Sequence, residues 1–287
     1  MLAHQAPVLM RLPGITAATV LVAVCTLLPF LPGGYDKLAV PLSAMAQVVG
    51  TAGLLVVPFG ALRLATDRSP RLGRWRFATT LLVVISTTFV WALVLVVTFI
   101  HSGFTLGIVV LAAAGYFVRR ALTTLGTLRR GAPDAPSVIP LYLTIVPVAS
   151  ALLQFALVER ATESSRSRAM RNAEPLIAAV EQYRAVNGRY PVSLLSVWRD
   201  YSPGVIGIER YQYEPHFDAY NLVFEQFTYR FGTREFVVYN PRDEQAVTAH
   251  AFDLLHLTPQ QLALERQRGH YEEEVAPAPH WKYFRFD

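Results

Sequence analysis

Charged side chains are scarce in this sequence. Asp, Glu, Lys and Arg make up 16% of its 287 residues, and hydrophobic residues make up 53%. An average soluble domain has about 25% charged residues. The composition therefore predicts a membrane protein.

Cysteine is almost absent. The single residue, Cys25, excludes an intramolecular disulfide and a thiolate metal cluster. It lies in an apolar run, where a free cysteine usually serves as a buried packing residue. A soluble part of this chain must therefore be stabilised by its core alone, and residues 159–287 are numerous enough for a domain.

Charge is missing altogether from five apolar stretches, which we interpret as transmembrane helices. A helix of about 20 residues crosses the hydrocarbon core of a bilayer. Only His101 and Ser102 separate the third stretch from the fourth, which predicts an antiparallel helical hairpin. The first stretch lacks the small residues of a signal-peptide cleavage site. The predicted spans are residues 15–32, 38–62, 77–100, 103–118 and 138–158.

No Asp, Glu, Lys or Arg lies within these spans. Ion pathways and coupled transport generally need ionisable groups inside the helical bundle, so their absence argues against transport. A transporter or lipid-handling component with a cavity between the spans stays open as an alternative. Gln47 and Gln154 are the main polar residues that would line such a cavity.

Positive charge is concentrated in the first half of the chain. Residues 1–158 hold eleven Lys or Arg and three Asp, a net charge of +8, and residues 159–287 hold the remaining fifteen basic and eighteen acidic residues. The basic character therefore belongs to the predicted membrane part. It is no evidence for nucleic-acid binding.

The arginines also predict an orientation. The loops at 63–76 and 119–136 carry five and four arginines, and Lys and Arg near span ends favour the cytoplasmic side. With five spans, the N-terminus is then cytoplasmic and residues 159–287 form an extracytoplasmic domain. We expect a bacterial inner-membrane protein with a periplasmic C-terminal domain.

The extracytoplasmic part begins with a polar segment, residues 159–169, that is either a solvated helix or a linker. Apolar residues between Met170 and Tyr183 then recur at helical spacing, which predicts a helix with one buried face. Asn187 and Gly188 supply a left-handed helix end. Pro175 requires that the helix either begins near Asn172 or kinks.

The remaining residues predict antiparallel strands and one short helix. Alternating aromatic and β-branched residues predict strands at 205–213, 220–231, 234–241 and 281–286, with a turn at 214–219. Residues 254–269 predict a short helix that is capped by Thr258 and has Pro259 at its first position. One helix packed on a small antiparallel sheet is an α+β domain.

The order of apolar span, amphipathic helix and aromatic-rich sheet resembles the type IV pilin and type II secretion major pseudopilin fold. The helix-end motif of that family is matched by Tyr183, Asn187, Gly188, Tyr190 and Pro191. Four further spans precede this helix, so prepilin peptidase cleavage would not release it. The resemblance therefore implies a pilin-like domain displayed on a membrane anchor, not a pilus subunit.

No catalytic constellation is found. The histidines form no metal-ligand spacing, the serines at 164, 165 and 167 have no paired histidine, and neither a phosphate loop nor a dinucleotide-binding glycine pattern occurs. We interpret Glu272–Glu274 as an exposed charge run rather than a calcium site. The sequence predicts a non-enzymatic protein without cofactor or metal.

Protein–protein interaction is the predicted role, with this chain as an accessory subunit that binds a membrane complex or another inner-membrane protein. Aromatic and arginine side chains are enriched at interfaces. The candidate interface residues are Tyr211, Tyr213, Tyr229, Arg230, Trp281 and Tyr283.

Overall fold

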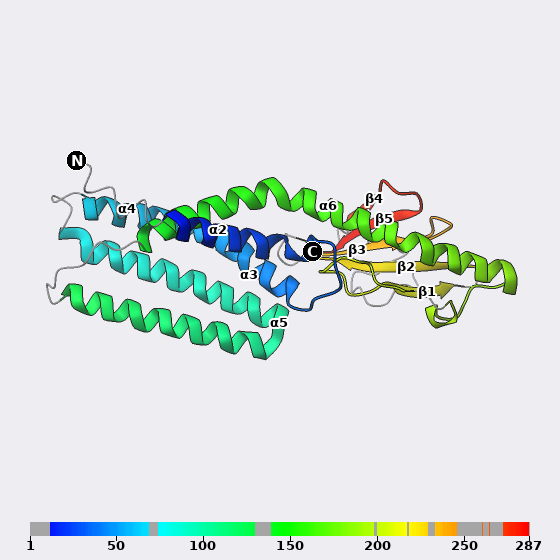
Figure 1. Ribbon diagram of the computed structural model, residues 1–287, viewed down its shortest axis with the longest axis horizontal. Helices are drawn as coiled ribbons and strands as arrows, with labels where there is room; N and C mark the ends of the chain where they lie inside the picture. The colour runs from blue at the N-terminus through cyan, green and yellow to red at the C-terminus, as the bar shows by residue number, and fades with distance from the viewer. Residues whose placement is uncertain are drawn as a thin grey trace. The chain divides into compact units, whose positions relative to one another are not determined.

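The chain divides into two compact units. The computed structural model describes residues 12–68, 74–129, 139–197, 200–216, 218–228, 233–245, 260, 264 and 272–286. The first unit contains Met1–Leu28 and Leu38–Val158, and the second contains Pro29–Lys37 and Glu159–Asp287. The elements (Figure 1) are α2 Leu12–Leu27, η2 Leu28–Phe30, α3 Ala39–Thr51, η3 Ala52–Val56, α4 Val57–Arg68, α5 Arg76–Arg129, α6 Ile139–Asn187, η5 Leu194–Ser196, β1 Gln212–His216, β2 Ala219–Gln226, β3 Arg234–Tyr239, β4 Glu272–Val275 and β5 Trp281–Phe286.

The described part of the chain has five helices long and apolar enough to cross a membrane, as the sequence predicts. The third and fourth form the predicted antiparallel hairpin, although helical backbone continues through residues 101–105. The rings of Trp91 and Phe117 lie 6.3 Å apart. A straight helix would separate them by about 39 Å, at about 1.5 Å per residue. The helix α5 therefore folds back on itself, as Figure 1 shows.

Two helices extend further than predicted. The helix α5 includes Arg119 and Arg120, which were expected in a loop, and α4 includes Arg63. Arg63 is buried, with 4% of its surface exposed. Its guanidinium donates hydrogen bonds to Thr80 Oγ1, at 2.8 Å, and to the carboxylate of Asp67. These partners let a charged residue remain inside the helical unit.

Small residues allow close helix contacts in the first unit. A Cβ on Gly50 would lie 3.5 Å from the backbone nitrogen of Ala151, and a Cβ on Gly53 would lie 3.0 Å from Pro147 Cβ. Glycines of this kind let membrane helices approach backbone to backbone.

One helix, α6, joins the two units. The segment 159–169 is part of this continuous helix, so it is not a linker, and the helix does not begin at Asn172. Pro175 is exposed, so the carbonyl that loses its helical hydrogen bond faces solvent. The buried side chains of its second half recur at helical spacing: Thr162, Ser165, Ala169, Ala173, Leu176 and Val180.

The second unit contains a five-stranded antiparallel sheet in the order β1-β2-β3-β5-β4. Side chains alternate between the faces of a strand, so every second residue of β2, β3 and β5 faces α6. The core shared by α6 and this face includes Ala169, Met170, Ala173, Leu176 and Val180 with Tyr220, Leu222, Phe224, Val237, Tyr239, Trp281 and Tyr283.

Two strand assignments from the sequence need correction. The predicted strand at 205–213 is wrong, because β1 begins only at Gln212 and includes Glu214–His216, which were expected in a turn. Glu272–Glu274 were expected as an exposed charge run; Glu272 and Glu274 are exposed, as predicted, but the segment forms the strand β4, which the sequence did not predict. Cross-strand ion pairs of 2.8 Å join Glu273 to Lys282 and Glu274 to Arg285, which offsets the poor strand propensity of glutamate. The predicted helix at 254–269 lies almost wholly outside the described residues.

The connection between the first two apolar helices belongs to the second unit. Gly33 donates a backbone hydrogen bond to Gly204 O at 3.1 Å, and Ile206 donates one to Leu31 O at 3.0 Å. Asp36 and Gly207 add two more such bonds. The segment 29–37 therefore pairs with residues 204–207, the region that the sequence predicted as a strand.

Candidate functional site

The second unit has a cavity of about 600 Å³ beside the start of its helix, which we call the charged pocket. Its walls come from α6, from the ends of β2 and β3, and from β4 and β5. Its lining residues are Glu159, Arg160, Thr162, Glu163, Arg166, Thr228, Thr233, Glu235, Glu274 and Arg285.

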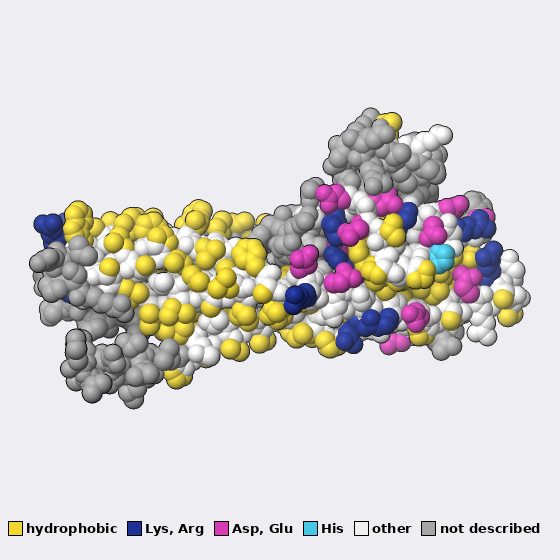
Figure 2. Space-filling view, turned by 90° about the horizontal axis from the view of Figure 1, so that it is seen from above, with side chains coloured by type: hydrophobic (Ala, Val, Ile, Leu, Met, Phe, Trp, Pro, Cys, Tyr) yellow, Lys and Arg dark blue, Asp and Glu magenta, His cyan; other side chains and the backbone are white. Residues whose placement is uncertain are grey.

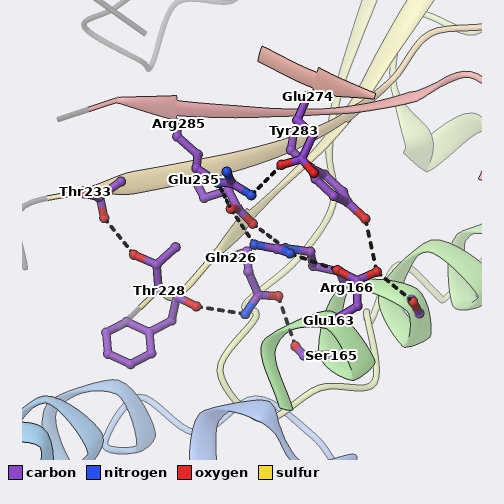
Figure 3. Close-up of polar contacts among 12 residues, drawn as sticks. Glu163, Ser165, Arg166, Gln226, Thr228, Thr233, Glu235, Glu274, Tyr283 and Arg285 are labelled. Carbon is purple, nitrogen blue, oxygen red and sulfur yellow. Dashed lines mark hydrogen bonds and ion pairs between the residues drawn. The ribbon is translucent and has the colours of Figure 1, made fainter. Parts of the chain in front are cut away.

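Glu235 is the centre of the pocket floor. Its side chain has no exposed surface. Arg166 donates to both carboxylate oxygens, from Nε at 2.5 Å and from Nη2 at 2.6 Å, and Arg285 Nε donates to Oε2 at 2.8 Å (Figure 3). Two guanidinium groups thus compensate one buried carboxylate.

Two further carboxylates complete this floor. Arg166 Nη1 donates to Glu163 at 2.9 Å, and Arg285 Nη2 donates to Glu274 at 2.8 Å. Burial lowers the pKa of both arginines, but hydrogen bonds and charges from Glu235 and the outer glutamates outweigh it, so each pKa lies above its usual value. The guanidinium of Arg166 also lies 4.6 Å from the ring centre of Tyr283. Burial, followed by the charge of Glu163, raises the pKa of Tyr283. The two guanidinium groups of the floor therefore stay charged near neutral pH.

The side chains at the rim of the pocket have fewer partners among the described residues than those of the floor. Glu159 and Arg160 are exposed and directly follow Val158, the last residue of the predicted fifth span. Within the described part of the chain, neither side chain has an ion pair or hydrogen bond. One cation and one anion are therefore available to a ligand at the entrance.

The alternation of residues along three strands is a sequence signal for this site. On three strands the residues facing α6 are aromatic or aliphatic until the strand end, where Gln226, Glu235 and Arg285 continue the same alternation. Ser165 continues the buried stripe of α6 and donates to Gln226 at 3.0 Å. Polar residues in buried positions need partners, so four such residues at one end of a core indicate a polar cluster there.

The residues predicted as an interface are placed mainly in the core. Tyr211, Trp281 and Tyr283 are buried, so they do not offer a surface to a partner and the interface prediction is corrected at these positions. Tyr213 is partly exposed, and its hydroxyl donates to Pro191 O at 2.9 Å. Tyr229 and Arg230 lie outside the described residues.

The helix-end motif closes α6 against the sheet. Gly188 has a φ of 71°, in the left-handed region, and donates to Arg184 O at 2.8 Å. Asn187 donates from its side chain to Tyr183 O at 2.8 Å. Tyr190 is buried and its ring lies 4.9 Å from that of Tyr220, so the chain after Gly188 folds back against the helix.

Three large apolar side chains at this end face solvent. Val186, Val192 and Leu195 are 78%, 77% and 72% exposed. We call these three residues the apolar tip. The Tyr190 hydroxyl accepts a hydrogen bond from Arg184 at 2.6 Å and donates one to Glu181 at 3.2 Å, so Val192 and Leu195 follow a residue that is fixed beside the last turns of α6.

The described residues contain no group of three or more His, Cys, Asp or Glu that could hold a metal ion. His280 lies 3.1 Å from Asp243, and the histidines at 250, 256 and 270 lie outside the described residues. In the first unit, Gln47 is buried and donates to Ser43 at 3.2 Å, and Gln154 is also buried. Comparison with known proteins finds no matching family model, no matching curated protein and no matching solved structure.

Proposed function

We propose that this protein is a membrane-anchored interaction module, in which five spans hold an extracytoplasmic, pilin-like α+β domain that binds a partner protein. The proposal places it in a bacterial inner membrane as an accessory subunit of a membrane complex, without enzymatic activity. The observation that carries it is the apolar tip, since Val186, Val192 and Leu195 fall within ten positions of the chain and are each more than 70% exposed, and exposed apolar surface of this kind suits an interaction site.

Charge around the apolar tip indicates what the partner offers. Arg189 is exposed and has no ion pair among the described residues. The guanidinium carbon of Arg184 lies 4.5 Å from the ring centre of Tyr190, and Glu181 accepts a hydrogen bond from the hydroxyl of the same tyrosine. The tip is therefore apolar with a basic border, which fits an apolar patch bordered by acidic side chains.

The proposed orientation of the protein in the membrane rests on two observations. Arginine clusters at 63–76 and 119–130 support a cytoplasmic location for those ends of the helices. The backbone pairing of residues 29–37 with 204–207 supports an opposite location for both of these segments. A reporter that fluoresces only in the cytoplasm should stay dark when fused after Asp287, and a bright fusion would overturn the orientation.

Site-specific photo-crosslinking in cells tests the interaction. A photoreactive amino acid at Val192 or Leu195 should yield one discrete crosslinked protein. The matched control is Val275, which is 73% exposed on β4 and lies outside the apolar tip. Equal crosslinking at all three positions, or a monodisperse lone monomer after extraction in mild detergent, would contradict the proposal.

A further inference from the structure

We propose that the charged pocket binds the headgroup of a zwitterionic phospholipid that carries a primary ammonium, as in phosphatidylethanolamine. This inference rests on the proposed membrane insertion of α6 but assigns a site that the interaction module does not require. The pocket volume of about 600 Å³ lies in the range of about 300–1,000 Å³ that small-molecule sites occupy.

The depth of the pocket matches a lipid headgroup. A helix rises about 1.5 Å per residue, so Arg160 lies about 3 Å and Glu163 about 7.5 Å beyond the last span residue, Val158. The headgroup layer extends about 5–7.5 Å beyond the hydrocarbon core on each side of a bilayer. Because α6 continues without a break through this region, the rim and outer floor of the pocket fall within that layer.

The charges of the pocket favour a zwitterion over a simple anion. The floor holds three carboxylates, Glu163, Glu235 and Glu274, against two guanidinium groups, Arg166 and Arg285. One negative charge is left over, which attracts an ammonium group and repels a second anion. At the rim, Arg160 is available for a phosphate. Arginine donors suit phosphate oxygens.

The lining distinguishes a primary ammonium from a quaternary one. Among the described residues, all ten that line the pocket are Glu, Arg or Thr, so none of them supplies the aromatic cage that a quaternary ammonium favours. The ring of Tyr283, which donates to Glu163, is covered by Arg166. Carboxylate and hydroxyl oxygens instead accept the hydrogen bonds that a primary ammonium donates.

Native mass spectrometry of the full chain, released from detergent micelles that contain both lipids, tests this site. The wild type should retain phosphatidylethanolamine at least about fivefold more than phosphatidylcholine. Arg160→Gln should lower retention about tenfold, because a hydrogen bond to a charged group is lost, and Glu159→Gln should reduce the preference between the two lipids. The matched control is Arg171→Gln, an exposed arginine on the same helix outside the pocket, which should retain the lipid as the wild type does.

Three outcomes would overturn the proposal. The wild type retains both lipids equally, or Arg160→Gln and Glu159→Gln behave like Arg171→Gln. Alternatively, soluble phosphoethanolamine raises the unfolding temperature of the protein while the lipid does not, which would assign the pocket to a free zwitterion. Displacement of the bound lipid by excess soluble phosphoethanolamine supports recognition through the headgroup.

Alkaline carbonate extraction separates this inference from the proposed membrane anchor. If the chain stays in the membrane fraction but shows no lipid preference, the lipid site is wrong and the anchor stands. If the chain is extracted, the membrane anchor itself is wrong and the lipid site is overturned with it.

Discussion

The two units differ in the side chains that they expose. In the first unit Phe104 and Phe155 are 75% and 73% exposed, whereas Ser43 and Gln47 are buried. In the second unit Tyr220 and Phe224 have no exposed surface, and most charged side chains lie outside, as Figure 2 shows for one face. Apolar side chains gather where the surroundings are apolar. The exposed aromatic side chains of the first unit are therefore compatible with an apolar surrounding, and the charged surface of the second with water.

Polar groups are also satisfied in different ways in the two units. Thr87 and Thr98 donate to backbone carbonyls one turn earlier in their own helix, at 2.7 and 2.6 Å. Such local bonds keep hydroxyls paired where no water is present. In the second unit, Arg166 and Glu235 pair across 69 positions of the chain. Hydrogen bonds within one helix can form among lipids, whereas an ion pair between residues far apart in the chain forms only when the core is folded.

The largest expected effect comes from aromatic truncation. Phe224→Ala should destabilise the second unit by about 3–5 kcal/mol, because a fully buried aromatic side chain is lost. Phe155→Ala, which removes the same atoms from an exposed position of the first unit, should change stability by less than about 0.5 kcal/mol. Hydrogen-exchange mass spectrometry on the full chain in detergent micelles measures both. Equal losses of stability in the two variants would contradict the difference in burial between Phe224 and Phe155.

Removal of the central carboxylate of the charged pocket should have a similar or slightly smaller effect. Glu235→Ala leaves two guanidinium groups without their shared partner, and breaking a buried pair costs about 3–5 kcal/mol. The control is Glu225→Ala, which breaks the exposed pair of 2.9 Å with Arg234 and should cost at most about 1 kcal/mol. Protection of β3 amides against exchange reports the difference. A Glu235→Ala protein as protected as the control would show that the floor is not buried in solution.

A carboxylate introduced on the exposed surface of each unit tests whether that surface faces lipid. Leu152 and Leu195 are 65% and 72% exposed, in the first and second unit respectively. Leu152→Asp should disfavour insertion by about 2.5–3.5 kcal/mol, because a charge is placed among lipid tails. Leu195→Asp should leave insertion unchanged. The membrane-inserted fraction of each variant checks this, and normal insertion of Leu152→Asp would place that surface outside the bilayer.

The smallest expected effect concerns the attachment of residues 29–37. A Cβ on Gly207 would lie 2.6 Å from Pro29 O, so Gly207→Ala should weaken this attachment by about 1–3 kcal/mol. Gly34→Ala is the control, because a Cβ there meets nothing within 4 Å. Faster amide exchange at Ile206 in the first variant alone is the expected result. Unchanged exchange in both would show that the backbone pairing does not protect this amide.

Much of the fold could be predicted because its signals are local. The apolar stretches, the two-residue connection at 101–102 and the helix end at Gly188 each depend on neighbouring residues. The strand at 205–213 was misplaced because its β-branched residues suit any extended segment, and the partner that pairs with it, residues 29–37, lies far away in the chain. The glutamates of β4 were predicted as an exposed charge run, and Glu272 and Glu274 are exposed, but their strand was missed because its ion pairs with Lys282 and Arg285 come from a distant segment.

The sequence by itself determined five apolar helices, a hairpin between the third and fourth, and an α+β domain after the fifth, because periodicity and composition act over a few turns. Only the tertiary structure decided that Tyr211, Trp281 and Tyr283 lie in the core and that Val186, Val192 and Leu195 face solvent. It alone brought Glu235 between Arg166 and Arg285. Burial and ion pairing depend on which distant segments meet, and that is a property of the packed chain.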